Sequence, residues 1–322
     1  MSNPAFTVMT AAGVAVDPRL LCGWVDDPRA MDEAMERNTS HPVFCMAGYQ
    51  VQDSGRGKVQ PLHKIVESVL GRYMPATVQT TGDCTSWGWS KIIDILKCVQ
   101  IAVGKSQETF KAVTTTELLY AASRVEIGKG QLGNEAGSVG AWVAEAVRNI
   151  GTLARDVYTV GGKTYDFRVY SGDLANKLGS RGVGVPDPLE SLTREHLVKS
   201  TSLIGSYEEA RDSIYNGYPV AVCSQQGFTN QRDEYGFARP SGTWPHCMAF
   251  VAMDDEFRRP GLLCDNRSWG ETWIAGPKRH DQPEGTFWVD ADTCNKMFKG
   301  RDSFNVTGYE GYPTQDLTHI LG

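Results

Sequence analysis

The 322-residue chain lacks the features that mark membrane, secreted or nucleic-acid-binding proteins. No apolar run approaches the ~18 residues that a membrane-spanning helix needs. Residues 1–10 contain no positively charged stretch followed by an apolar core, so they do not resemble a secretory signal. No basic run is present, and the formal net charge is −6. We therefore expect a cytoplasmic chain without a membrane anchor and without a nucleic-acid partner.

Pairs of closely spaced cysteines are also missing. The eight cysteines are scattered, and none forms a C-x-x-C pair, so the spacing predicts neither a zinc site nor a dense disulfide framework. We expect mostly reduced thiols, as in a protein that folds in the cytoplasm, and no metal or cofactor. Hydrophobic residues make up 41% of the chain and charged residues 22%, which is the composition of an ordinary globular protein.

One cysteine stands in a setting that suggests chemistry. Cys84 follows the turn-like pair Gly82-Asp83, and apolar residues recur at helical spacing from there to about Gly104. This pattern predicts a helix that begins at or near Cys84, with one apolar stripe facing a core. The helix dipole and the free N–H groups at a helix N-terminus favour a thiolate, so we expect a lowered thiol pKa if a histidine cation is close. The alternative is a buried structural cysteine, which is the commoner role for an arbitrary cysteine.

The first 75 residues are predicted to form an N-terminal extension. Short helices are expected at residues 28–37 and 62–70, and a short strand at residues 43–51. No motif with known chemistry occurs in this extension.

The rest of the chain is predicted to form two lobes. Residues 76–160 are helical in pattern and would carry the nucleophile, and residues 161–322 would form a β lobe that carries the histidine and the asparagine. Residues 161–206 are expected to be an irregular connection with one short helix. Short apolar runs then predict mostly antiparallel strands at residues 220–224, 247–253, 261–264 and 286–289. Helices followed by strands indicate an α+β fold with two lobes.

Two polar residues flank neighbouring strands of this β lobe. His246 precedes one predicted strand and Asn266 follows the next. Because strands joined by a short loop pair antiparallel, we expect these side chains to lie close together. An amide oxygen can then orient an imidazole and fix its tautomer. Together with Cys84 they provide the nucleophile, base and orienting group of covalent acyl transfer.

In this order the motifs resemble papain-like cysteine peptidases of the C1 type, especially divergent bacterial and phage-encoded members. The resemblance covers roughly residues 75–300. It is carried by Gly82-Asp83-Cys84-Thr85-Ser86-Trp87, residues 117–124, residues 216–222, Pro245-His246-Cys247 and residues 266–273. It implies the two-lobed papain-like fold, a helical lobe plus an antiparallel β lobe, here with an N-terminal extension.

The resemblance also implies the role of each site residue. Cys84 would be the nucleophile, His246 the base and acid, and Asn266 the orienting group. Gln79 would donate its side-chain amide to the oxyanion hole, and Trp269 would form core or cleft wall. The implied activity is hydrolysis of peptide or amide bonds through a thioester, on a polypeptide or on the peptides of peptidoglycan.

Two departures from the family pattern fall on supporting residues. Gln79 stands five residues before Cys84, where the family has six, and Arg267 separates Asn266 from the Ser-Trp-Gly that follows. Asn266 therefore needs a one-residue bulge to reach the histidine. Two alternatives stay open. One is a structural protein that keeps the fold, for example in a virus particle, and binds neighbouring subunits through residues 1–75. The other is acyl transfer to a nucleophile other than water.

Overall fold

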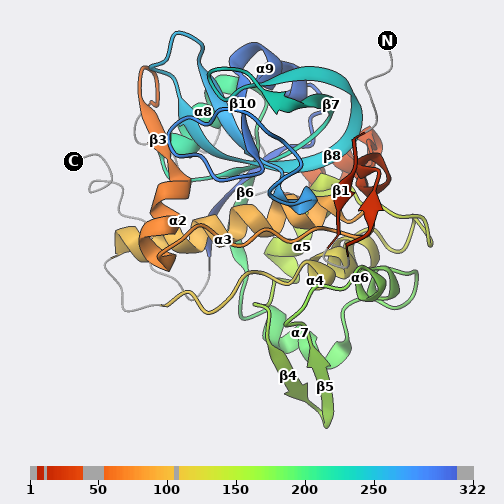
Figure 1. Cartoon of the computed structure of the whole chain (residues 1–322). Helices are drawn as coiled ribbons and strands as arrows, with labels where there is room; N and C mark the ends of the chain where they lie inside the picture. The colour runs from red at the N-terminus through yellow and green to blue at the C-terminus, as the bar shows by residue number, and fades with distance from the viewer. Residues whose placement is uncertain (1–5, 11–12, 39–53, 105–108, 310–322) are drawn as a thin grey trace.

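The computed structural model describes residues 6–10, 13–38, 54–104 and 109–309 (Figure 1). The strand expected at residues 43–51 lies outside these ranges. A long helix, α3 (Cys84–Gly104), runs between a β sheet on one side and a group of shorter helices on the other (Figure 1). The α+β layout with a helical part and a β part is therefore confirmed.

Helix α3 begins at Cys84, as the sequence pattern indicates. The expectation of a single apolar stripe is wrong, however, because even polar residues such as Ser86, Asp94 and Lys97 are buried on this helix. The sheet covers one face and the helical part covers the other, so hardly any side of α3 meets water. Its central place makes α3 the element against which both parts of the site are built.

The helical part is assembled from short elements. They are α4 (Thr116–Ala121), a π-helical turn (Ala122–Ile127), α5 (Gly140–Asn149), α6 (Gly172–Leu178), α7 (Asp187–Thr193) and the hairpin of β4 (Val157–Val160) with β5 (Lys163–Asp166). The stretch 161–206, expected to be irregular with one helix, thus contains two short helices and also strand β6 (Val198–Leu203).

The sheet is antiparallel, in the order β10-β9-β8-β7-β11-β6, with β3 added beside β8. Its other strands are β3 (Val59–Pro61), β7 (Val220–Arg232), β8 (Ala238–Asp254), β9 (Gly261–Asp265), β10 (Thr286–Asp290) and β11 (Phe304–Tyr309). The four predicted strands are all present. Strands β7 and β8 extend well beyond the predicted runs because they continue as a ribbon whose outer half is largely polar.

The described parts of the N-terminal extension contact both sides of the molecule. Its helices α1 (Pro28–Arg37) and α2 (Leu62–Leu70) have the predicted bounds. Helix α1 packs on α5, where Arg37 and Glu145 form an ion pair at 2.8 Å, and α2 packs on α3. The extension also contains β1 (Val8–Met9), β2 (Ala15–Val16) and the 3-10 turn Pro18–Leu21.

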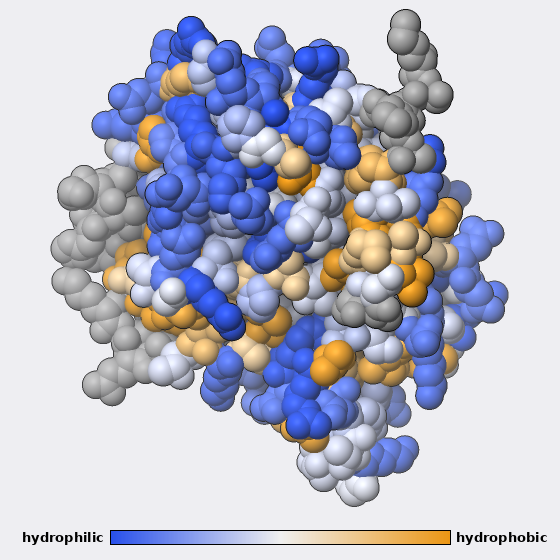
Figure 2. Space-filling model, viewed as in Figure 1, coloured by the Kyte–Doolittle hydropathy of each residue, from blue (hydrophilic) through white to orange (hydrophobic). Residues whose placement is uncertain are grey.

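Part of the extension's surface is apolar. Hydrophobic residues gather over the β1–β2 region in Figure 2, and Met9, Val14 and Leu20 are exposed there. On the far side of the sheet from α3 lie α8 (Tyr207–Tyr215) and α9 (Ala291–Phe298) (Figure 1). Within the described ranges no helix combines the length and the apolar character that a membrane span requires.

Candidate active site

Cys84 is the first residue of α3, and its thiol is fully buried. Its Sγ accepts a hydrogen bond from the backbone N–H of Gly23 at 3.2 Å. Burial raises the pKa of this thiol well above its usual range, and the N–H groups of Gly23 and Cys247 offset this only in part. The expected lowering of the Cys84 pKa is therefore wrong for this form of the chain, since loss of water outweighs the position at a helix N-terminus.

His246 and Asn266 meet as the sequence order suggests. The Nε2 atom of His246 lies 2.8 Å from Oδ1 of Asn266, and both side chains are buried. An amide oxygen can only accept, so Nε2 carries the proton and Nδ1 keeps its lone pair, which is the form a general base requires. Burial lowers the pKa of His246 to about 4, opposed by the hydrogen bond to Asn266. The imidazole is thus neutral near pH 7.

The packing of β8 on α3 brings the histidine strand to the nucleophile helix. A Cβ atom at Gly88 would lie 2.7 Å from Sγ of Cys247 and 3.0 Å from the carbonyl oxygen of Met248, so β8 lies against α3 more closely than a side chain at position 88 would allow. Cys247 directly follows His246, and its N–H faces the Cys84 thiol. In this form Nδ1 of His246 has no hydrogen-bond partner among the described residues, and Cys84 is bonded to Gly23 instead.

Arg267, the extra residue after Asn266, turns away from the histidine. It opens a 3-10 turn, Arg267–Trp269, and its buried guanidinium lies 3.4 Å from Asp265 and over the ring of Tyr73 at 4.3 Å. The insertion therefore does not prevent the bond from Asn266 to His246. The pairing of β8 with β9 is shifted by one residue between Phe250 and Ala252, because consecutive residues of β9 there face two residues of β8 that are not consecutive.

Trp269 shields the imidazole. Its ring centroid lies 4.6 Å from that of His246, and its side chain is 1% exposed. Trp244 and Trp273 pack around it at 4.8 and 5.5 Å, and Phe6 of the N-terminal extension lies 6.2 Å away. In this form Trp269 is a lid over the histidine, inside an aromatic cluster, and not an exposed surface.

Gln79 is buried, and its amide is already in use. Its Nε2 donates to the carbonyl oxygen of Leu21 at 2.6 Å and to that of Thr81 at 2.8 Å. Leu21 is two residues before Gly23, which contacts the thiol. The amide that would bind an oxyanion and the thiol that would attack therefore both contact one short stretch of the extension.

That stretch, residues 21–25, is called the covering segment below. Besides the contacts of Leu21 and Gly23, the N–H of Trp24 donates to the carbonyl of Pro245 at 3.0 Å. Ser138 donates to the carbonyl of Gly23 at 2.8 Å and accepts from the N–H of Val25 at 2.9 Å. The covering segment is thus bonded both to the histidine strand and to the residues that precede α5.

Gly23 allows this close fit. A Cβ atom at position 23 would lie 1.8 Å from the carbonyl oxygen of Gly82, so only glycine is accommodated there. Trp24 anchors the segment, since its Nε1 donates at 2.7 Å to Asp302, a buried carboxyl group that also caps α5. The sequence analysis does not predict this arrangement. The available signal is the apolar run at residues 20–25, which directly follows the turn-like Asp17-Pro18-Arg19.

The arrangement of the helices, the sheet and the three site residues defines the fold class of the chain. The chain has the papain-like fold, in which the cysteine begins the central helix, the histidine lies in β8 and the asparagine directly follows β9, and the predicted fold is confirmed. The roles assigned to the site residues stay predictions.

Two solved structures illustrate the likeness. Xylellain, a cysteine protease from Xylella fastidiosa, has a TM-score of 0.50 and 13% identity over 94% of this chain and 95% of that one. The proCathepsin B S9 of Trypanosoma congolense has a TM-score of 0.53 and 12% identity over 92% and 87%. At such identities the likeness concerns the fold alone, and the link to phage-encoded members stays a prediction. No family model and no curated protein matches the sequence.

Proposed function

We propose that this chain is a cysteine peptidase that hydrolyses peptide or amide bonds of polypeptides. The observation that carries the proposal is the 2.8 Å bond from His246 to Asn266, which leaves Nδ1 as an acceptor on a strand that packs against the helix beginning with Cys84. Among the described residues no group of three or more His, Cys, Asp or Glu side chains is placed to hold a metal ion. The proposed chemistry uses the side chains of Cys84, His246 and Gln79, a backbone N–H and water.

In the reaction, Nδ1 of His246 takes the thiol proton and the thiolate of Cys84 attacks the substrate carbonyl carbon. The resulting oxyanion would be held by the Gln79 amide and the backbone N–H of Cys84. The imidazolium then gives its proton to the departing amine, which leaves a thioester. Water, deprotonated by the same imidazole, attacks the thioester and releases the acid and the thiol. Asn266 keeps the ring in the orientation that each step needs.

The form described here is, in this proposal, latent. The covering segment supplies the hydrogen bond to the thiol that His246 would otherwise make, and its Leu21 carbonyl occupies the Gln79 amide. Both reacting groups are uncharged, since burial raises the pKa of Cys84 and lowers that of His246. A substrate can reach the site only after residues 21–25 move away.

The test compares two ways of displacing the segment. One chain lacks residues 1–26, the other is full length with Gly23→Ala, and each is also made with Cys84→Ala. All are incubated with a broad peptide library and with a thiol-directed epoxide. We expect both displaced forms to cleave peptides and to bind one epoxide at Cys84, and the Cys84→Ala partners to do neither.

Folding is monitored in the same samples. The buried thiols of Cys98, Cys264 and Cys294 stay unlabelled as long as the core is intact. A folded, displaced chain that neither cleaves peptides nor takes up the epoxide would overturn the proposal. It would favour the structural alternative, for which the exposed Met9, Val14 and Leu20 offer an apolar contact surface. Binding of other subunits through residues 1–75 stays a prediction, tested by comparing the assembly state of the two chain lengths.

A further inference from the structure

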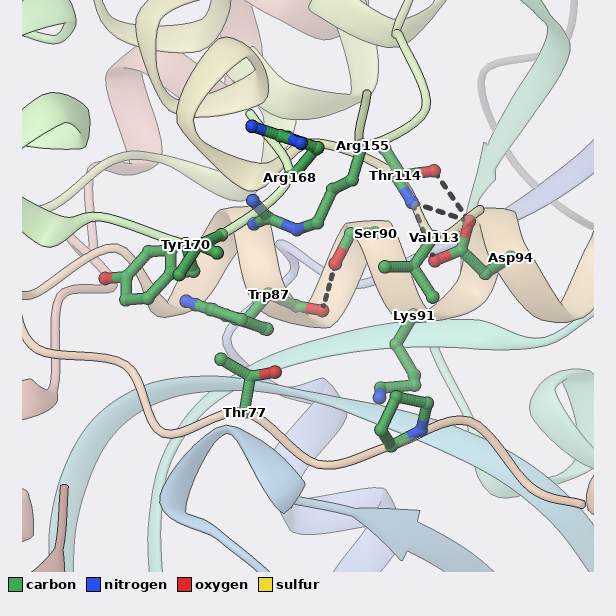
Figure 3. Close-up of a pocket in the computed structure, with 12 residues that line it drawn as sticks. Thr77, Trp87, Ser90, Lys91, Asp94, Val113, Thr114, Arg155, Arg168 and Tyr170 are labelled. Carbon is green, nitrogen blue, oxygen red and sulfur yellow. Dashed lines mark hydrogen bonds between the residues drawn. The ribbon is translucent and has the colours of Figure 1, made fainter. Parts of the chain in front are cut away.

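A cavity of about 260 Å³ lies along α3, between the helical part and the loop that precedes Cys84 (Figure 3). Its walls include Thr77 from the loop before Cys84, Trp87 and Lys91 from α3, and Arg155, Arg168 and Tyr170 from the helical part. None of its lining residues belongs to the covering segment. The cavity is therefore open even while residues 21–25 occupy the catalytic site.

Lys91 is the polar group of this cavity with the most unused hydrogen-bonding capacity. Its side chain is 12% exposed, and its ammonium lies 3.9 Å from Asp265, which is too far for a hydrogen bond. Asp265 already accepts hydrogen bonds from Tyr73 and from the N–H of Arg267, each at 2.9 Å. Burial lowers the pKa of Lys91. A partly desolvated ammonium with free donors is stabilised by an anion that reaches it.

The other charged groups in the cavity wall are matched. Arg155 forms an ion pair with the buried Glu117 at 2.9 Å, and Arg168 pairs with Asp166 at 2.7 Å. Both carboxylate oxygens of Asp94 accept from the N–H of Thr114 at 3.0 Å. Lys91 is thus the cation available to a ligand, whereas Arg155 and Arg168 already have carboxylate partners.

An aromatic wall completes the cavity. The rings of Trp87 and Tyr170 meet edge to face with centroids 4.9 Å apart. The buried Asp83 holds both, accepting from Trp87 Nε1 at 3.1 Å and from the Tyr170 hydroxyl at 3.0 Å. A fixed apolar wall next to a cation suits a short aliphatic chain that ends in a carboxylate.

We propose that this cavity binds the acidic side chain of a peptide, with Lys91 as the group that recognises the carboxylate. The proposal rests on the proposed peptidase function. Lys91 is seven residues beyond Cys84, which corresponds to about 10 Å along a helix that rises ~1.5 Å per residue. An extended peptide advances ~3.3 Å per residue, so the acidic residue would lie about three positions from the bond that is cleaved.

Binding is tested first on the intact full-length chain, because the cavity needs no activation. Glutarate, its neutral diamide glutaramide and inorganic phosphate are titrated separately by calorimetry. We expect glutarate to bind at one site, glutaramide not to bind, and phosphate to bind at least tenfold more weakly than glutarate. Lys91→Met should weaken glutarate binding at least tenfold, Lys91→Arg should restore part of it, and Lys177→Met, at an exposed lysine of α6, should change nothing.

Absence of glutarate binding, equal binding of glutaramide, or unchanged binding by a folded Lys91→Met would overturn the proposal. Tighter binding of phosphate would also overturn it, by showing a general anion site. In the displaced chain, peptides with Glu three positions from the cleaved bond should exceed their Gln counterparts in kcat/KM, and Lys91→Met should remove the preference. An equal rate for both would overturn the substrate role. If no peptide is cleaved at all, the peptidase proposal fails while the glutarate titration still decides the binding site.

Discussion

Replacing Gly23 by alanine should uncover Cys84 without unfolding the protein. The added Cβ would lie 1.8 Å from the carbonyl oxygen of Gly82, whereas real Cβ contacts are at least 3.0 Å. The obstacle is backbone, which has no rotamer to change, so the segment must shift by more than an ångström. A shift of that size disrupts the hydrogen bonds on either side of position 23.

The size of the effect follows from the bonds that are lost. Four of them flank the position: Gly23 to the thiol, Trp24 to Pro245, and the two with Ser138. At a net contribution of roughly 0.5–1.5 kcal/mol per hydrogen bond, the covered state loses about 2–6 kcal/mol relative to the open one. The rate of alkylation at Cys84 should then rise between about 30-fold and 10⁴-fold, at a tenfold change per ~1.4 kcal/mol.

The assay is iodoacetamide labelling at pH 7.5, followed by peptide mapping in the mass spectrometer. Gly205→Ala is the matched control, because a Cβ at Gly205 meets only the end of the Glu209 side chain at 3.5 Å. Labelling at Cys98, Cys264 and Cys294 reports any general loosening of the core. If Gly23→Ala leaves the Cys84 rate at the wild-type value in a folded protein, residues 21–25 do not control access to the thiol.

Three further outcomes are expected. Burial lowers the pKa of His246 to about 4 in the folded chain, whereas a histidine ordinarily has a pKa of 6.5, so the unfolded chain takes up a proton first as the pH falls. The free energy of unfolding should therefore decrease from pH 6.5 towards pH 4, and it should be about 2 kcal/mol lower at pH 5. Urea unfolding of His246→Gln should lack this component, and an identical pH dependence in both proteins would contradict the assignment. Gln79→Ala in the displaced enzyme should lower kcat by about 10²–10³-fold with little change in the urea midpoint, and an unchanged kcat would show that another donor holds the oxyanion. Cys84→Ala should abolish peptide hydrolysis while leaving the full-length protein folded, so residual cleavage would point to another nucleophile.

Much of the local structure could be predicted because it depends on neighbours in the chain. Helices α1 and α2 have the predicted bounds, since each shows an apolar stripe or a turn signal that a short window contains. The start of α3 at Cys84 follows from the Gly82-Asp83 turn in the same way. The meeting of His246 and Asn266 could also be anticipated, because a short loop between two strands dictates antiparallel pairing.

Contacts between distant segments could not be predicted in this way. The amino-acid sequence by itself determined the α+β class, the helix that presents Cys84 and the strands that carry its candidate partners. Only the tertiary structure decided that residues 21–25 cover the thiol, because the fit depends on Gly23 meeting Gly82, 59 residues away in the chain. It also decided the pKa of Cys84. A helix N-terminus favours the thiolate locally, but burial under a distant segment removes the water that a charge requires, and this larger effect has no signature in the neighbouring residues.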